Sequence, residues 1–183
     1  MQYSVNYGPN GYVMNLKQYI RDIPDFPKPG ILFRDITPLL YHQESFRFCV
    51  DAFAKKAKII SPDVIVGIES RGFIFGSALA YEMKLPFVPI RKAGKLPYFV
   101  REVKYDLEYG SDILQIHSDV IQPSQRVVLV DDLVATGGTI RASRELIEKM
   151  GGNIVGINTV IILKDLCIPE ILDDEVLFSL VDF

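Results

Sequence analysis

Cysteine is scarce in this sequence, and its two copies exclude several kinds of site. Cys49 and Cys167 lie far apart in the 183-residue chain, each among apolar neighbours, and they lack the spacing of metal ligands. Two reduced thiols in a hydrophobic core are therefore favoured over a disulfide or a catalytic role. This interpretation favours a reducing compartment.

Basic residues are not in excess, and long apolar runs are missing. The formal net charge is −3 and the sequence pI is about 5.4, without a basic run, so we do not expect a nucleic-acid partner. No stretch approaches the roughly 20 apolar residues of a membrane span. The opening residues also lack the basic segment and apolar core of a secretory signal. We therefore expect a cytoplasmic protein without a membrane partner.

What is present suits one folded domain, residues 1–183. The composition is 49% hydrophobic and 23% charged, and a chain of this length buries on the order of 70% of its unfolded surface. Val/Ile-rich runs alternate with helical patterns: strands are expected over 63–69, 85–92, 126–132 and 153–163, and helices over 72–84 and 139–152. This alternation predicts an α/β doubly wound fold with a mostly parallel sheet, which binds ligands at the carboxyl ends of its strands.

Two segments interrupt the alternation. Helices are expected over 14–22 and 44–60, but the four prolines and one glycine of IPDFPKPGILFRDITPLL between them predict an ordered, extended arm. Residues 93–123 mix glycine and proline with alternating polar and apolar residues. They predict a long antiparallel excursion with a mobile tip.

The stretch VVLVDDLVATGGT, residues 127–139, carries the strongest functional signal. An apolar strand ends in Asp131 and Asp132, whose adjacent charges would repel each other and lose hydration if they served stability alone. The turn that follows allows close backbone approach, and its N–H groups can hold an anion at the start of the next helix. The stretch therefore predicts a phosphate cradle made by Ala135, Thr136, Gly137, Gly138 and Thr139.

The spacing of this cradle excludes two common phosphate motifs. No Gly-Lys-Ser/Thr follows, as a Walker loop requires, and the glycines lack the dinucleotide-binding spacing. A ribose phosphate suits the pattern, with its 5′-phosphate in the turn and its hydroxyls donating to Asp131 and Asp132. A magnesium ion that bridges a pyrophosphate would offset the remaining charge. The alternative is an ordinary strand-to-helix turn capped by the aspartates.

At this point the sequence resembles a known family. VVLVDDLVATGGT is similar to the phosphoribosyl pyrophosphate signature of the type I phosphoribosyltransferases. Four further stretches resemble the adenine-specific members of that family: DFPKPGILFRDITPLL at 25–40, GIESRGFIFG at 67–76, RKAGKLP at 91–97 and LEYG at 107–110. The resemblance covers about residues 15–165 and implies the type I phosphoribosyltransferase fold, with an N-terminal hood (about 15–43) and a mobile catalytic loop (93–117).

The resemblance implies that two groups of residues bind pyrophosphate. One is the loop of Glu69, Ser70 and Arg71, in which the family has a cis bond that corresponds here to Glu69–Ser70. Many members have aspartate where this chain has Glu69. The other group is a closing loop with three cations, to which the dimer mate contributes in the family: Arg91, Lys92 and Lys95. The alternatives are a surface salt bridge for Arg71 and a solvated basic loop for the cations.

The resemblance also implies how the base is bound and activated. Glu108 is expected to exchange a proton with the N7 end of the purine, with Tyr109 closing the site; without the resemblance, Glu108 is a solvated hairpin residue. Leu32, Phe33 and Arg34 are expected at the adenine, although Phe33 could instead dock the arm on the core. The closing segment LFSLVDF is expected to stay away from the site.

The implied function is magnesium-dependent transfer of a phosphoribosyl group from phosphoribosyl pyrophosphate to adenine, giving AMP and pyrophosphate, by a homodimer. One alternative is transfer to hypoxanthine, xanthine or orotate, against which the hood argues. Another is a regulator that senses phosphoribosyl pyrophosphate and binds nucleic acid. Only about 60 residues precede the first core strand, and the arm and helices use most of them, which argues against a winged-helix domain there.

Overall fold

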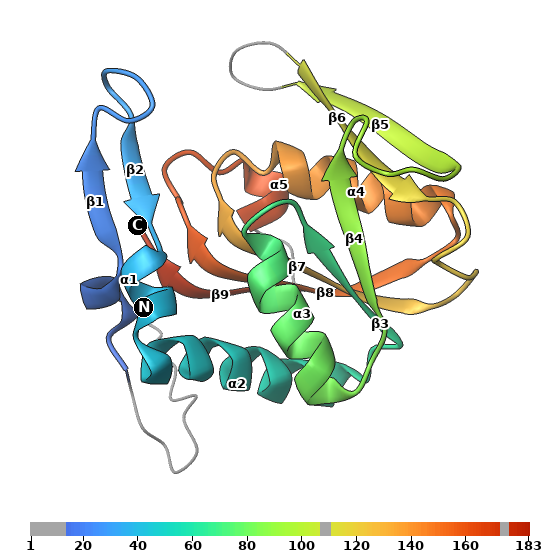
Figure 1. Ribbon diagram of the computed structural model, residues 1–183, viewed down its shortest axis with the longest axis horizontal. Helices are drawn as coiled ribbons and strands as arrows, with labels where there is room; N and C mark the ends of the chain where they lie inside the picture. The colour runs from blue at the N-terminus through green and yellow to red at the C-terminus, as the bar shows by residue number, and fades with distance from the viewer. Residues whose placement is uncertain (1–13, 107–110, 173–175) are drawn as a thin grey trace.

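The computed structural model describes residues 14–106, 111–172 and 176–183, and a seven-stranded sheet forms its centre (Figure 1). Five neighbouring strands run parallel, and a hairpin of two strands extends one edge in the antiparallel sense. The predicted doubly wound, mostly parallel sheet is thus confirmed. In spatial order the strands are β5 (Val100–Asp106), β6 (Ser111–His117), β4 (Phe87–Lys92), β3 (Val64–Ile68), β7 (Arg126–Val134), β8 (Asn153–Ile162) and β9 (Leu177–Asp182).

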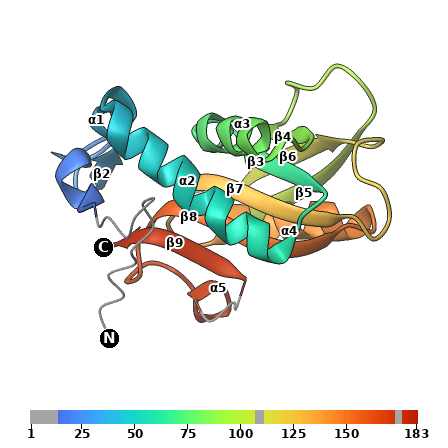
Figure 2. The ribbon, with the colours of Figure 1, turned by 90° about the horizontal axis from the view of Figure 1, so that it is seen from below.

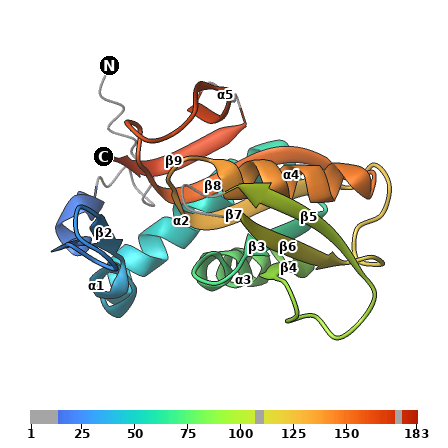
Figure 3. The same ribbon diagram turned by 90° about the horizontal axis from the view of Figure 1, so that it is seen from above.

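The alternation of side chains along β7 explains the layers of the molecule. Val127 and Leu129 pack with α4 (Gly138–Lys149) and α5 (Pro169–Leu172), whereas Val128 and Val130 pack with α2 (Gln43–Ile60) and α3 (Gly72–Met83). Successive side chains of a strand point to opposite faces, so the helices cover both faces of the sheet (Figures 2 and 3). Two adjacent side chains at the end of β7 therefore face different layers.

The helices expected over 44–60, 72–84 and 139–152 are present as α2, α3 and α4. The last of them is shorter than expected and ends at Lys149. Gly151 adopts a left-handed conformation, with φ of 82°, so the chain turns there into β8.

The N-terminal hood differs from the sequence prediction. Instead of a helix over 14–22, a short 3-10 helix, η1 (Leu16–Tyr19), precedes β1 (Arg21–Pro24). β1 forms an antiparallel hairpin with β2 (Leu32–Asp35), and α1 (Thr37–Tyr41) follows. The helix prediction was wrong because this segment is determined by its pairing with β2, a distant strand, and ion pairs across the hairpin support that pairing.

The excursion over 93–123 is the β5/β6 hairpin. β6 joins the edge of the sheet through two residue pairs with β4, and β5 packs against α4. The hairpin therefore stands over the carboxyl ends of the parallel strands (Figure 3). Its tip, residues 107–110, lies outside the described residues.

The structure also shows the state of the two cysteines and the length and apolar character of the helices. Cys49 and Cys167 are both free and buried, as predicted. Among the described residues, no helix combines the length and the apolar character needed to cross a membrane.

Candidate active site

The predicted carboxylates lie within β7 and not, as expected, at its end. Pairing of β7 with β3 stops at Val130, but β8 continues beside β7 as far as Val134. Asp131 and Asp132 are therefore held by strand pairing on one side while they pass the carboxyl end of β3 on the other. The sequence misplaced the strand end because it gives no sign of how far the neighbouring strand extends.

Burial perturbs both carboxyl groups. Burial, and then the charge of Asp132, raise the pKa of Asp131 well above its usual range. Burial also raises the pKa of Asp132, against the effect of Arg71, whose Nε lies 3.0 Å from Asp132 Oδ2. That oxygen is buried, and because the contact with Arg71 lacks the geometry of a hydrogen bond, it has an ion-pair partner but no hydrogen-bond partner among the described residues. The pair is thus a costly arrangement that a hydroxyl donor or a cation would relieve.

The turn after β7 has the geometry of an anion cradle. Gly137 precedes α4 with φ of 92°, a conformation that favours glycine, and as the N-cap residue it has no side chain to cap the helix; the Gly138 N–H makes one long bond, 3.4 Å, to Thr136 Oγ1. Backbone N–H groups at the start of α4 are therefore available to a negative ligand. A cavity of about 210 Å³ lies here, lined by Asp131, Ala135, Thr136, Gly137 and Thr139 among others.

A second cavity, of about 290 Å³, adjoins the carboxylates and is lined both by the loop before α3 and by the β5/β6 hairpin. Ser70, Arg71 and Lys92 line it together with both aspartates. The peptide bond between Glu69 and Ser70 is cis, as the resemblance implies. The predicted loop and the predicted carboxylates therefore share one cavity.

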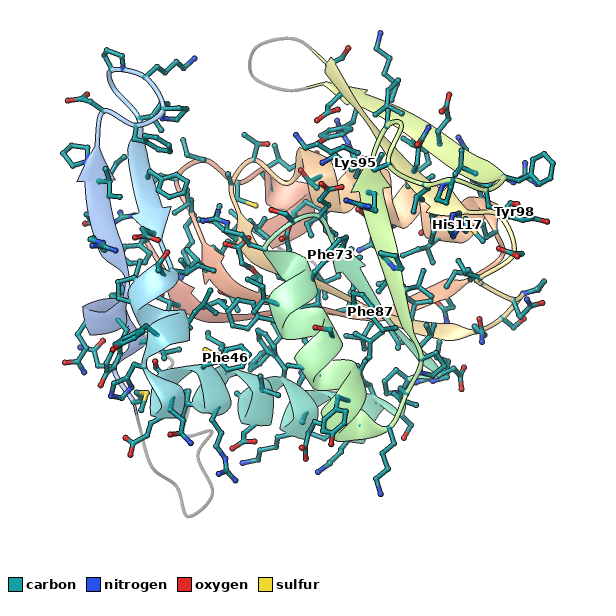
Figure 4. All side chains as sticks on the ribbon, in the orientation of Figure 1. Phe46, Phe73, Phe87, Lys95, Tyr98 and His117 are labelled. Carbon is teal, nitrogen blue, oxygen red and sulfur yellow. The ribbon has the colours of Figure 1, made fainter. Side chains whose placement is uncertain are left out.

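The three cations of the RKAGKLP stretch are all paired with carboxylates. Glu69 forms ion pairs with Arg91, at 3.1 Å, and with Lys95. Lys92 Nζ lies 2.9 Å from an oxygen of Asp112. Burial raises the pKa of Glu69, but Lys95, the Lys92 backbone N–H and Arg91 together lower it below its usual value. Figure 4 shows Lys95 beyond the carboxyl end of β4.

This pairing separates the three cations into two groups. Lys92 lines the 290 Å³ cavity, whereas Arg91 and Lys95 are not among the described residues that line it. The side chain of Glu69, only 8% exposed, is long enough to reach both of them. The basic loop is therefore neither freely solvated nor aimed as a whole at the cavity.

A third and larger cavity, of about 670 Å³, lies under the hood. Leu32, Phe33 and Arg34 line it from β2, and Arg71 and Ala135 line it from the neighbouring loops. Its remaining lining is mainly apolar, as suits a flat aromatic ligand, and comprises Gly30, Ile31, Leu133, Leu163, Asp165, Leu166 and Phe183.

The donor set at the carboxylates fits a magnesium ion that arrives with a phosphate ligand. Among the described residues, no group of three or more His, Cys, Asp and Glu side chains could hold a metal ion. Mg²⁺ is commonly held by one or two carboxylates, with phosphate oxygens and water completing its shell. Asp131 and Asp132, which both line the 290 Å³ cavity, provide two carboxylates, either of which could contribute to such a shell.

Comparison with known proteins identifies the family of the chain that has this geometry. The phosphoribosyl transferase domain matches residues 37–166. The adenine phosphoribosyltransferase of Nostoc punctiforme is 52% identical over 172 residues, which cover 93% of this chain and 100% of that relative. The enzyme of Microcystis aeruginosa is 51% identical with the same coverage. The chain belongs to the adenine phosphoribosyltransferase family.

Solved structures of adenine phosphoribosyltransferases share the fold. The structure from Thermoanaerobacter pseudethanolicus matches with a TM-score of 0.87 and 46% identity, covering 92% of this chain and 98% of that one. The Saccharomyces cerevisiae enzyme, complexed with adenine and an imino-altritol bisphosphate, matches with a TM-score of 0.83 and 38% identity, covering 91% and 96%. The type I phosphoribosyltransferase fold expected from the sequence is thus confirmed.

Several lining residues of this adenine phosphoribosyltransferase family member were not predicted from the sequence, among them Leu133, Tyr105 and Phe183. Leu133 lines all three cavities, and Tyr105 of β5 lines the one beside the carboxylates. Phe183 lines the cavity under the hood, so the expectation that the closing segment stays away from the site was wrong. Period-two alternation from Asp131 could have identified Leu133, whereas the other two depend on contacts between distant segments. The predicted Glu108 and Tyr109 lie outside the described residues.

Proposed function

We infer that the protein transfers the 5-phosphoribosyl group from phosphoribosyl pyrophosphate to adenine, giving AMP and pyrophosphate in purine salvage. The observation that carries this conclusion is that three cavities meet at Leu133. One is an anion cradle, one contains two carboxylates and cations, and one is apolar and covered by the hood. A ligand with a phosphate, a ribose and a flat base requires this sequence of environments.

We propose that phosphoribosyl pyrophosphate binds along the end of β7. The 5′-phosphate accepts hydrogen bonds from the backbone of residues 135–139, and the ribose hydroxyls donate to Asp131 and Asp132. The pyrophosphate lies in the 290 Å³ cavity, near Ser70, Arg71 and Lys92. Asp131 or Asp132 would help to hold a magnesium ion that arrives with this substrate, and the ion would supply positive charge to the pyrophosphate.

The base is proposed to bind under the hood, between Leu32, Phe33 and Arg34. As the bond between the ribosyl carbon and pyrophosphate breaks, purine N9 forms the new bond to that carbon, and the pyrophosphate takes the electron pair. In its exchange with the N7 end of the ring, the Glu108 carboxylate accepts the proton that the purine loses as N9 bonds, and Tyr109 closes the site; both roles rest on the resemblance. The hood and the hairpin exclude water, which would otherwise attack the same carbon.

We further propose that the protein works as a homodimer, as implied for the family. In the family the dimer mate contributes cations of this loop to pyrophosphate. In this chain Glu69 pairs with Arg91 and Lys95, so these cations would reach pyrophosphate, in either subunit, only if the loop changed its pairing. Sedimentation equilibrium tests the dimer, which has twice the 20.7 kDa of one chain. A single species of 20.7 kDa at assay concentrations would contradict it.

The reaction is tested by AMP formation from adenine, phosphoribosyl pyrophosphate and magnesium, beside parallel reactions with hypoxanthine, guanine and orotate. Adenine-selective turnover is expected. Glu108→Gln should lower kcat at least about 100-fold, the low end of catalysis by proton transfer. Glu102→Gln on the same hairpin, an exposed residue outside the cavities described here, is the matched control and should change kcat less than about twofold.

The outcomes of this assay separate the alternatives. Turnover with hypoxanthine or orotate but not adenine would favour a transferase for another base. Binding of phosphoribosyl pyrophosphate without turnover of any base would favour a sensor. Neither alternative is supported by the relatives described above, which are named for adenine.

A further inference from the structure

The ring of Phe183 lies within reach of two cations of the hood. Arg34 Cζ is 3.8 Å from the ring centroid, and Lys17 Nζ is 4.6 Å from it. Cations within about 6 Å of an aromatic face are attracted to it, more strongly where water is excluded. The Arg34 side chain is only 14% exposed, so its contact with the ring is largely shielded from solvent.

The backbone of Phe183 belongs to the sheet and not to the hood. Its N–H donates to the carbonyl of Ile162 at 3.0 Å, and its carbonyl accepts from the N–H of Lys164 at 2.9 Å. These bonds fix the residue at the end of β8, whereas Arg34 belongs to the hood strand β2. The contact between ring and guanidinium therefore joins the hood to the rigid sheet.

Arg34 is held from its other sides as well. Its guanidinium forms an ion pair with Asp22 of β1, and its carbonyl accepts from Arg71 Nη1 at 3.4 Å. Arg71 in turn pairs with Asp132, as described above. Arg34 is thus the point at which the hood meets the carboxylate pair, and Phe183 packs on the guanidinium there.

We propose that Phe183 is a positioning residue for the base: its ring holds the Arg34 side chain and so fixes β2 at the distance that a purine requires. This inference rests on the proposed function and deepens it. Both residues line the 670 Å³ cavity, so the width of that cavity depends on their contact. A hood fixed before binding lowers the ordering cost of binding the base and leaves the phosphate cradle unaffected.

The test uses Phe183→Leu, which keeps an apolar side chain but removes the aromatic face, and Phe183→Tyr, which keeps the ring. Phe183→Leu should raise KM for adenine about 5- to 30-fold, the range expected for a partly desolvated cation–π contact. Its kcat and its KM for phosphoribosyl pyrophosphate should stay within about twofold of the wild type. Phe183→Tyr should restore the wild-type KM for adenine.

Tyr81→Leu is the matched control, because this aromatic side chain on α3 is 88% exposed and lies outside the three cavities. Its KM for adenine should match that of the wild type. Thermal unfolding of each variant checks that the fold is intact. Calorimetric titration with adenine and with AMP gives a second readout, in which Phe183→Leu weakens both affinities by a similar factor.

Two results would overturn the proposal. One is a wild-type KM for adenine in Phe183→Leu, which would mean that the aromatic face has no role. The other is an equal rise of both Michaelis constants, the mark of a general loss of structure. If the wild type made no AMP, the proposed function would fail, but unequal adenine affinities of the wild type and Phe183→Leu would still support the positioning role.

Discussion

At the residue scale, the burial of Asp131 and Asp132 lowers the stability of the fold but provides two carboxylates for the site. The two side chains point to opposite faces of β7, so that Asp131 borders the cradle before α4 and Asp132 meets Arg71 at the start of α3. The Asp132 backbone N–H donates to Asp131 Oδ1 at 2.8 Å. One bond of this kind does not offset the burial of two carboxylates, so the free protein is expected to be less stable than an uncharged variant.

Asp131→Asn is expected to stabilise the protein and to damage its activity. The amide oxygen can still accept from the Asp132 N–H, while the buried charge is gone. The pKa of Asp131 is raised in the folded state. The contribution of this group to the free energy of unfolding is therefore fully present below the unfolded pKa of about 3.9, and it is lost as the pH rises through the folded-state pKa. The variant should therefore gain about 1 kcal/mol at pH 8 and much less below the unfolded pKa of about 3.9, where Asp131 is protonated in both states.

Urea unfolding at several pH values measures this difference, and AMP synthesis measures the loss of activity. We expect kcat to fall at least about tenfold, because the charge beside the developing ribosyl cation is removed. Asp63→Asn is not a suitable control, since Asp63 accepts from the Arg126 N–H at the start of β7. Asp119→Asn, on an exposed turn, is a better one. A stability gain that does not depend on pH would contradict the explanation that the gain comes from removing the buried charge of Asp131.

Site residues were predicted correctly from the sequence where a single continuous segment contains the whole pattern. Asp131, Asp132 and Gly137 follow from an apolar run and a glycine-rich turn, both of which are local. Phe183 and Tyr105 could not be found in this way, because their positions depend on contacts with β2 and α4. A terminal aromatic residue or a strand tyrosine, taken alone, is typical of a hydrophobic core.

At the element scale, the start of α4 is fixed by its contact with α5. Gly137 has φ of 92°, and a Cβ added there would lie 2.7 Å from Ile171 Cγ1. Any side chain at this position must therefore move α5 or the cradle. This contact explains why the turn needs glycine for space as well as for its backbone conformation.

Gly137→Ala should lower the free energy of unfolding by about 2 to 3 kcal/mol, of which about 1 kcal/mol is backbone strain and the rest overpacking. Gly94→Ala isolates the strain, because Gly94 has φ of 78° and no atom of the described residues within 4 Å of the added Cβ. It should cost about 1 kcal/mol. Urea unfolding compares the two variants, and an equal loss in both would contradict the role of Ile171.

The hood shows why element prediction failed at the N-terminus. The pattern over 14–22 suits a helix, but Asp22 pairs with Arg34 across the β1/β2 hairpin both in register and by charge. The prolines between the strands correctly predicted a break in any helix, although the local pattern could not show that the chain turns back on itself. The central strands were predicted correctly because continuous Val/Ile runs need burial on both faces whatever their order.

At the scale of the whole molecule, the three cavities lie along the carboxyl ends of the parallel strands, as expected for a doubly wound sheet. Leu133 borders all of them, and Arg71 borders both the cavity under the hood and the one beside the carboxylates. The hood and the β5/β6 hairpin stand on either side of these strand ends (Figure 1). A single extended substrate would thus contact the sheet, the hood and the hairpin at once.

Substrate binding should therefore stabilise the entire fold, and magnesium should do so only together with the substrate. At about 100 times its dissociation constant, phosphoribosyl pyrophosphate with magnesium adds about 2.7 kcal/mol, which corresponds to a rise in Tm of about 5 to 10 °C for a chain of this length. Magnesium alone should change Tm by less than about 1 °C, because two carboxylates without phosphate oxygens form a weak site. Thermal unfolding with phosphoribosyl pyrophosphate and magnesium, with the substrate and EDTA, and with magnesium alone measures these terms. A full shift with magnesium alone would mean that the protein itself completes the metal site, and the proposed role of the substrate pyrophosphate would be wrong.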